Sequence, residues 1–290
     1  MEQRFISIWF RYLNTDWFSL HQPHLKNLPF VLRTPSHGRM VITGKKEDSL
    51  KYANLAYKIK DAIISRYYIP NTGRFDNATQ SAQILALWYG ISPQKDSSFK
   101  ILMNEFARHN WHLSTGIFST MMTFDILREN DMNDIAYRIA NQRDYPGWGN
   151  MIANGATTLW ETWAYPESGP SQNHPMFGSV DEWFYKSLAG INASAPGFKK
   201  IIIKPQPAEL TWAKGSYRSV YGEIVSDWKK NGDTFELNVE IPANTTATIY
   251  IPVKSNQPVT ISGGLINAKY IDGKAVIKIG SGKYHFKTKQ

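Results

Sequence analysis

The chain has 290 residues, of which 42% are hydrophobic and 13% aromatic, so it is long and apolar enough for one large or two medium domains with buried cores. It has no cysteine, which excludes disulfides, thiolate metal sites and cysteine nucleophiles. The net charge of +9 comes mainly from the last hundred residues, because residues 191–290 carry 14 basic and 7 acidic side chains, against 19 and 17 in residues 1–190. The excess lysines are spread singly along predicted strands, so we expect a solvated face and no nucleic-acid partner.

Membrane, metal and compartment signals are weak. No apolar run approaches transmembrane length, and we expect no membrane partner. Glu2, Arg4 and Arg11 interrupt the apolar start, which is unlike a signal peptide, and the compartment stays open between cytoplasm and periplasm. His21 and His24 have no acidic or thiol residue nearby, so we expect no metal and no other cofactor.

Residues 1–44 form an atypical N-terminal segment. Residues 5–14 are aromatic and partly helical in pattern. The following stretch, residues 21–44, carries prolines and a glycine that break helices: Pro23, Pro29, Pro35 and Gly38. We therefore expect an irregular segment here.

From Lys45 onwards the apolar spacing is helical. The pattern predicts helices at about residues 45–67, 78–89, 99–106, 117–129, 133–142 and 179–191. Short turns join them, which indicates antiparallel helical hairpins over residues 45–192.

After residue 192 the apolar spacing alternates, as in strands. The predicted strands lie at residues 199–204, 217–228, 235–241, 247–253, 259–262, 275–279 and 284–287. Asn231-Gly232 suits a hairpin turn. The expected fold class is therefore mainly α and then β, with residues 193–290 forming an antiparallel β-sandwich.

The most informative stretch is residues 144–183, DYPGWGNMIANGATTLWETWAYPESGPSQNHPMFGSVDEW. It places Glu161 between Trp160 and Trp163 on a predicted short helical turn, followed by a loop with Asn173 and His174. An acid desolvated among indole rings gains proton affinity and suits acid–base chemistry on a sugar. The alternative is structural, because Thr158 and Glu161 also fit the S/T-x-x-E capping box.

The whole string resembles the end of the catalytic domain of bacterial α-L-rhamnosidases, which are inverting six-hairpin glycosidases. Their motif reads close to YPSWGYMI-GATTIWERW and then NH-x-FGSV-EW. The resemblance implies that Glu161 is the general base and that His174 contacts the sugar, with Asn173, Trp148 and Trp160 as further binding residues. Thr162 departs from the family, which has arginine after the glutamate.

Two weaker matches add candidate sugar contacts. Asp16-Trp17 resembles the family's Gly-Asp-Trp, although Thr15 replaces the glycine. His112 begins a segment similar to the family's HL-x-TG-x-x-GT loop, and the alternative of a loop histidine bonded to a carbonyl stays equally open. The segments GFKKIIIKP, SYRSVYGEI and IPANTTATIYIP also resemble the C-terminal β-domain of these enzymes.

The resemblance implies most of the second half of an (α/α)6 barrel, followed by the β-sandwich. It implies hydrolysis, with inversion, of terminal α-L-rhamnosyl residues in oligosaccharides or glycosides. About seven helices fit where twelve would close the barrel, and nothing matches the segment that carries the family's general acid; Asp125, Asp134 and Asp144 lie in ordinary contexts. Two interpretations stay open: part of an α-L-rhamnosidase, with a missing N-terminal portion as its partner, or a non-catalytic remnant or sugar-binding protein.

Overall fold

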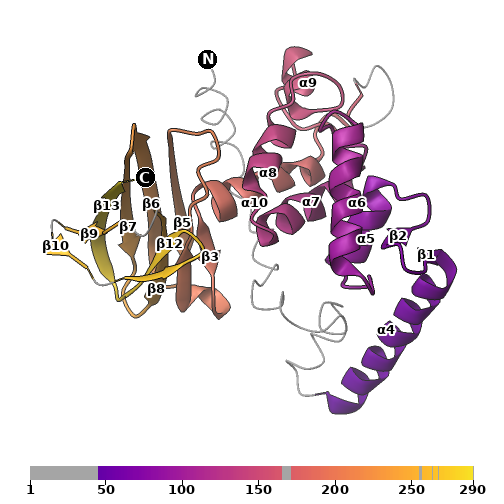
Figure 1. The fold of residues 1–290 in the computed structure, drawn as a ribbon, viewed down its shortest axis with the longest axis horizontal. Coiled ribbons are helices and arrows are strands. Elements are labelled where there is room, and N and C mark those ends of the chain that lie inside the picture. Colours follow the sequence, from indigo (N-terminus) through magenta and orange to yellow (C-terminus); the bar gives the residue numbers. More distant parts are fainter. Residues whose placement is uncertain (1–44, 165–170, 255–256, 263, 267, 290) are drawn as a thin grey trace.

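The computed structural model describes residues 45–289 except residues 165–170, 255–256, 263 and 267. The predicted sugar contacts Asp16 and Trp17 lie outside the described residues. Figure 1 shows a helical part and a β part side by side, with the boundary near residue 190. None of the helices in the described ranges combines the length and the apolarity that crossing a lipid bilayer requires.

The helical part contains hairpins, as the apolar spacing predicts. Its helices are α4 (Lys46–Tyr67), α5 (Gln80–Trp88), α6 (Lys95–Arg108), α7 (Ile117–Glu129), α8 (Asn133–Ala140), α9 (Trp148–Ala153) and α10 (Ser179–Trp183). A 3-10 turn, η3 (Pro175–Gly178), leads into α10, and a π-helical turn, η4 (Phe184–Leu188), continues it. A small hairpin of β1 (Tyr68–Ile69) and β2 (Arg74–Phe75) connects α4 to α5.

Helices α5, α7 and α10 form an inner layer that positions the long loops. Helix α7 contacts α5 on one side and α10 and η3 on the other, while α6 packs on α5 and α8 packs on α7. Short connections, residues 89–94 and 130–132, close the hairpins at one end. The long loops, residues 109–116, 141–147 and 154–174, each lead into α7, α9 or η3 at the opposite end. The long loops that carry the predicted site residues therefore meet at this end of the layer.

The β part is a two-sheet sandwich. Its strands are β3 (Ile191–Ala193), β4 (Lys200–Ile203), β5 (Trp212–Ser219), β6 (Gly222–Asn231), β7 (Thr234–Ile241), β8 (Thr246–Pro252), β9 (Thr260–Ile261), β10 (Gly264–Leu265), β11 (Lys269–Ile271), β12 (Lys274–Ile279) and β13 (Gly282–Lys289), and the 3-10 turn η5 (Pro196–Phe198) follows β3. The sheet orders are β10-β9-β13-β7-β6-β5 and β11-β12-β8-β4-β3. All pairs are antiparallel except β4 with β8, which is parallel. Trp228, Phe235 and Phe286 are fully buried between the sheets.

Outside the Glu161 segment, one predicted strand and the end of one predicted helix differ from the structure. The single strand predicted at residues 217–228 is the hairpin β5–β6, in which Ser219 pairs with Gly222 across a two-residue turn. The Ser219 hydroxyl accepts a hydrogen bond from the Tyr221 amide and donates one to the Gly222 carbonyl, which fixes that turn. The last helix ends at Leu188, before Gly190, whose φ of 77° is not helical. A Cβ at Gly190 would lie 2.3 Å from the backbone of Lys204, so this position requires glycine.

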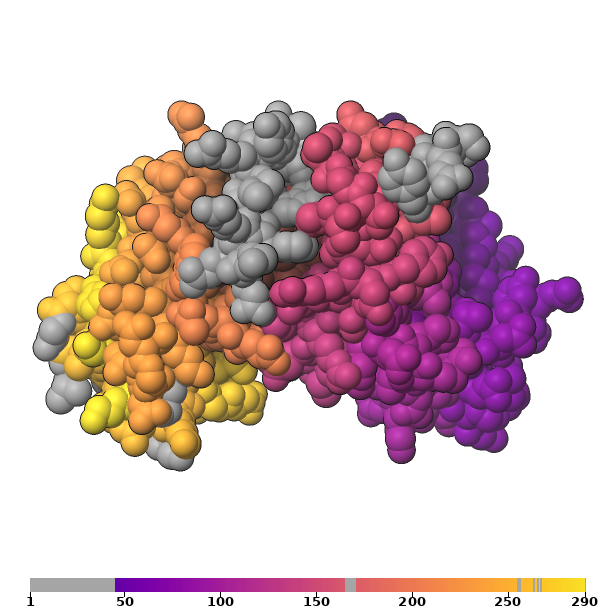
Figure 2. Space-filling view, turned by 90° about the horizontal axis from the view of Figure 1, so that it is seen from above, coloured from indigo at the N-terminus to yellow at the C-terminus, as the bar shows by residue number. Residues whose placement is uncertain are grey.

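Buried indole N–H groups join the two parts, which lie against each other in the space-filling view (Figure 2). Trp183 donates to Asn133 Oδ1 at 2.7 Å, and Asn133 Nδ2 donates to the carbonyl of Gln206 at 2.7 Å. Trp228 of β6 donates to the carbonyl of Leu188 at 2.7 Å. Directional bonds from fully desolvated donors fix how the β part sits against the end of the helical layer.

Candidate active site

The Glu161 segment is a paired loop and not the predicted helical turn. Residues 155–164 contain turns and bends, and their partner is the stretch after residue 170. The amide of Glu161 donates to the carbonyl of Ser171 at 2.9 Å, and the amide of His174 donates to the carbonyl of Leu159 at 2.8 Å. The hydroxyl of Thr158 donates to the carbonyl of Gln172. Because Thr158 bonds across the loop, the capping-box alternative is wrong for this pair.

The Glu161 side chain is half-buried at the edge of this loop. Its Oε2 accepts a hydrogen bond from the amide of Ser171 at 3.0 Å. Oε1 has no hydrogen bond or ion pair to a residue within the described ranges. The carboxylate is therefore oriented through one oxygen, with the other oxygen available.

The tryptophans of the motif pack into the core of the helical part. Trp148 is 4% exposed, Trp160 3% and Trp163 8%. The ring of Trp163 stacks on Phe177 with centroids 4.0 Å apart and meets Trp148 edge-on at 4.9 Å. Both Trp148 and Trp160 therefore pack beneath the loop as supports, and their contact with a sugar stays a prediction.

Asn173 and His174 follow directly on the partner arm of the loop. Asn173 is exposed, and its amide donates to the hydroxyl of Ser171 at 3.1 Å. His174 Nδ1 accepts from the amide of Met176 at 3.3 Å, which caps η3. An acceptor Nδ1 places the ring hydrogen of neutral His174 on Nε2. His174 Nε2 has no partner in the described parts of the chain and is a free donor.

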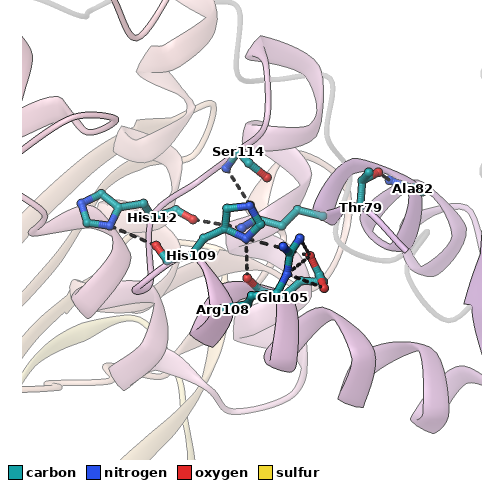
Figure 3. Close-up of polar contacts among 8 residues, drawn as sticks. Thr79, Ala82, Glu105, Arg108, His109, His112 and Ser114 are labelled. Carbon is teal, nitrogen blue, oxygen red and sulfur yellow. Dashed lines mark hydrogen bonds and ion pairs between the residues drawn. The ribbon is translucent and has the colours of Figure 1, made fainter. Parts of the chain in front are cut away.

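His112 has both ring nitrogens engaged by protein groups. Its Nε2 lies 2.8 Å from Asp144 Oδ1. Its Nδ1 lies 3.1 Å from the carbonyl of Asn110 and 3.2 Å from the carbonyl of His109, a contact drawn in Figure 3. The structure thus favours the alternative of a carbonyl-bonded loop histidine over a direct sugar contact.

Further hydrogen bonds join the loops at this end of the layer. Trp163 Nε1 donates to the carbonyl of Thr115 at 2.7 Å, and Trp148 Nε1 donates to the carbonyl of Phe177 at 3.1 Å. Gln80, in the first turn of α5, donates to the carbonyl of His112 and accepts from the amide of Ser114, each at 2.9 Å. These buried bonds are cross-loop contacts, which no local spacing in the sequence predicts.

A buried acid that the sequence did not single out lies on α10. Asp181 is 8% exposed, and burial raises its pKa to about 7. One residue further, Glu182 forms an ion pair with Lys186. No group of acidic and histidine side chains in the described ranges is arranged to hold a metal ion.

Comparison with known proteins gives the family. A layer of helical hairpins with its long loops at one end, followed directly by a β-sandwich, defines a two-part protein of the helical-barrel class. Residues 38–188 match the bacterial α-L-rhamnosidase six-hairpin glycosidase domain, and residues 190–265 match the bacterial α-L-rhamnosidase C-terminal domain. The chain therefore belongs to the bacterial α-L-rhamnosidase six-hairpin glycosidase family.

Relatives and solved structures agree with this assignment. An α-L-rhamnosidase of Streptomyces avermitilis is 30% identical over 285 residues, which is 93% of this chain and 28% of the relative. The solved α-L-rhamnosidase of Dictyoglumus thermophilum superposes with a TM-score of 0.80 at 33% identity, covering 88% of this chain and 30% of that one. The Streptomyces avermitilis enzyme complexed with L-rhamnose gives 0.78 at 32% identity, covering 87% and 25%. This chain thus spans less than a third of the length of each of these relatives.

Proposed function

We propose that this chain supplies the general base, Glu161, and part of the sugar-binding surface of an enzyme that hydrolyses terminal α-L-rhamnosyl residues with inversion. The observation that carries the proposal is the half-buried carboxylate of Glu161, held through Oε2 by the Ser171 amide at the loop end of the inner layer. Family membership supports the substrate class, because the relatives are α-L-rhamnosidases.

The chemistry requires two carboxyl groups on opposite sides of the scissile bond, about 6.5–9.5 Å apart. As a water oxygen attacks the anomeric carbon, Oε1 of Glu161 takes a proton from that water. A carboxylic acid on the other face gives its proton to the departing glycosidic oxygen. The hydrogen bond from Ser171 engages Oε2 and leaves Oε1 for this role.

Sugar binding falls to the residues beside the base. His174 offers Nε2–H as a donor to a sugar hydroxyl, and the exposed amide of Asn173 offers both a donor and an acceptor. A solved relative carries L-rhamnose, which supports this sugar as the ligand. Asp16 and Trp17 remain predicted contacts, and Trp148 and Trp160 contribute as buried supports.

A further part of the enzyme is the proposed partner. The relatives are more than three times as long as the region they share with this chain, and a domain of six hairpins needs more helices than α4–α10 provide. Helix α4 presents large exposed apolar side chains, among them Leu50, Leu55 and Ile59. We assign this face to the hairpins that complete the barrel and carry the general acid.

Sugar binding without hydrolysis is the second candidate function. It is favoured by the sequence itself, in which nothing matches the acid-bearing segment of the family. A base without its acid protonates no leaving group, so such a protein binds rhamnose and releases it unchanged.

Hydrolysis of p-nitrophenyl α-L-rhamnoside separates the two candidates. p-Nitrophenolate is a good leaving group that departs with little help from a general acid. For the first candidate we therefore expect this chain to release p-nitrophenol, and we expect Glu161→Gln to lose that release while it retains L-rhamnose binding measured by calorimetry. Glu182→Gln is the matched control, because Glu182 is paired with Lys186 on α10. Binding of L-rhamnose with no release of p-nitrophenol would establish the second candidate, and absence of both would contradict the proposal.

A further inference from the structure

We infer that His112 and Asp144 are positioning residues, whose ion pair joins two loops and, through Trp163, fixes the segment that carries Glu161. This inference rests on the proposed role of Glu161 as general base. It gives His112 a role other than the direct sugar contact that the sequence suggested.

The hydrogen-bond partners of His112 define what the ring does. Two carbonyl oxygens face Nδ1, so Nδ1 carries a hydrogen and donates. A carboxylate oxygen of Asp144 faces Nε2 at 2.8 Å, and this contact is attractive when Nε2 also carries a hydrogen. The ring then donates from both nitrogens in a charge-assisted arrangement. No ring nitrogen is left for a ligand.

Asp144 is bound to this ring although it lies at the surface. Its side chain is 78% exposed, whereas that of His112 is 13% exposed. The hydrogen bond from His112 is the main reason that the pKa of Asp144 is lowered. The carboxylate therefore exchanges part of its water shell for a fixed imidazole, which ties residues 141–147 to residues 109–116. Gln142 Nε2 strengthens the same junction by donating to the carbonyl of Asn110 at 3.2 Å.

Residues 112–115 connect His112 to the segment that carries Glu161, and hydrogen bonds fix these residues in place. Gln80 fixes the carbonyl of His112 and the backbone amide of Ser114. Figure 3 labels both His112 and Ser114. The next residue, Thr115, is 2% exposed, and its carbonyl accepts the indole hydrogen of Trp163 at 2.7 Å. Trp163 lies two residues after Glu161. A shift of the loop that contains His112 is therefore passed to the base segment through one buried hydrogen bond.

The consequence is a division of roles around Glu161. Ser171 orients the carboxylate of Glu161 itself. Asp144 and His112 hold the loop of residues 109–116, to which the Glu161 segment is hydrogen-bonded through Trp163. Small displacements matter here, because misplacing a reacting group by about 1 Å costs up to roughly a hundredfold in rate. Neither His112 nor Asp144 touches the reacting atoms in this assignment.

The test uses Asp144→Asn, which keeps the shape and removes the charge, and Asp144→Glu, which keeps the charge. Asp233→Asn, in the exposed β6–β7 turn, is the control for loss of one negative charge. Imidazole ¹⁵N spectra report the hydrogens on His112, and exchange of the indole N–H reports the Trp163–Thr115 bond. Titration with L-rhamnose reports the site.

For Asp144→Asn we expect changed imidazole ¹⁵N signals of His112, indole exchange of Trp163 faster by about threefold or more, and weaker L-rhamnose binding. Asp144→Glu should recover most of each effect, and Asp233→Asn should show none. Unchanged Trp163 exchange in Asp144→Asn would overturn the inference. If the unaltered chain binds no L-rhamnose, the proposed function fails, while the His112 and Trp163 signals still decide this assignment.

Discussion

Glu161 and Ser171 are joined by two hydrogen bonds, one from the Glu161 amide to the Ser171 carbonyl at 2.9 Å and one from the Ser171 amide to Glu161 Oε2 at 3.0 Å. The first bond is backbone pairing that any residue at position 161 can make. The second depends on the side chain. The acid thus serves its own loop as well as the proposed chemistry, so stability and activity have to be measured separately in every Glu161 variant.

Substitutions of Glu161 test this double role. Glu161→Gln keeps an oxygen that can accept from the Ser171 amide, so we expect that amide to exchange as slowly as in the unaltered protein. In Glu161→Ala the acceptor is gone, and exchange should accelerate roughly two- to tenfold. Hydrogen–deuterium exchange resolved at Ser171 measures the difference. Equal exchange in Glu161→Ala and the unaltered chain would show that the side-chain bond does not hold the loop.

The sequence predicted the helical layer well because its signals are local. The range predicted for α7, residues 117–129, is the observed one, since apolar spacing and the preceding Gly116 both lie within one short stretch. The sandwich was predicted from alternation for the same reason. The prediction of one strand at residues 217–228 was wrong because it did not detect the two-residue turn between Ser219 and Gly222.

The site was predictable as a set of residue types and not as a geometry. Resemblance assigned Glu161, Asn173 and His174 to one site, and the structure places them on the two paired arms of one loop. The burial of Trp148 and Trp160 was missed, because a tryptophan-rich motif does not distinguish rings that face a sugar from rings that pack in the core. The contact between His112 and Asp144 was missed because they lie 32 positions apart.

Trp163→Phe tests the buried bond between the loops. A phenyl ring fills most of the space on Phe177 but leaves the carbonyl of Thr115, which is 2% exposed, without its donor. An unsatisfied buried acceptor costs about 1–3 kcal/mol, so the free energy of unfolding should fall by that order. Trp212→Phe, at a site that is 41% exposed, should change it little. Urea unfolding measures both variants, and equal stabilities would argue against the bond.

Asp181 makes stability depend on pH. Burial raises its pKa from 3.8 to about 7, so the folded state retains a proton that the unfolded state loses. Its contribution is fully present below pH 3.8 and is lost as pH rises through the folded pKa. Stability should thus fall between about pH 4 and pH 7, by up to a few kcal/mol at 1.36 kcal/mol per pKa unit.

Asp181→Asn removes this ionisation and keeps the shape. We expect it to be more stable than the unaltered chain at pH 8 and to show a smaller fall in stability between pH 5 and pH 8. Asp233→Asn, at an exposed turn, is the control and should follow the unaltered profile. Urea unfolding at the two pH values measures the difference. Parallel profiles for Asp181→Asn and the unaltered chain would show that Asp181 is charged in the folded state.

Helix α4 tests the idea that a further part of the domain covers it. Five of its polar residues, Lys51, Asn54, Lys58, Asp61 and Ser65, form one narrow strip, and beyond the first turn the rest of the circumference is apolar apart from Lys60 and Arg66. Of its residues only Ala56 is buried in the described structure, and Figure 1 shows the helix extending away from the others. A helix with so wide an apolar surface is suited to burial between neighbours.

Leu55→Glu combined with Ile59→Glu places two charges on the exposed apolar face, where the side chains are 48% and 47% exposed. In the isolated chain we expect weaker binding of the dye ANS and less concentration-dependent association, with a nearly unchanged Tm, because little packing is lost. Lys58→Glu, on the polar strip, should alter neither. A Tm lowered by several degrees would mean that the chain itself already covers this face. Unchanged ANS binding and association would mean that this face of α4 is not an exposed interaction surface. The proposed position of the further hairpins would then be wrong.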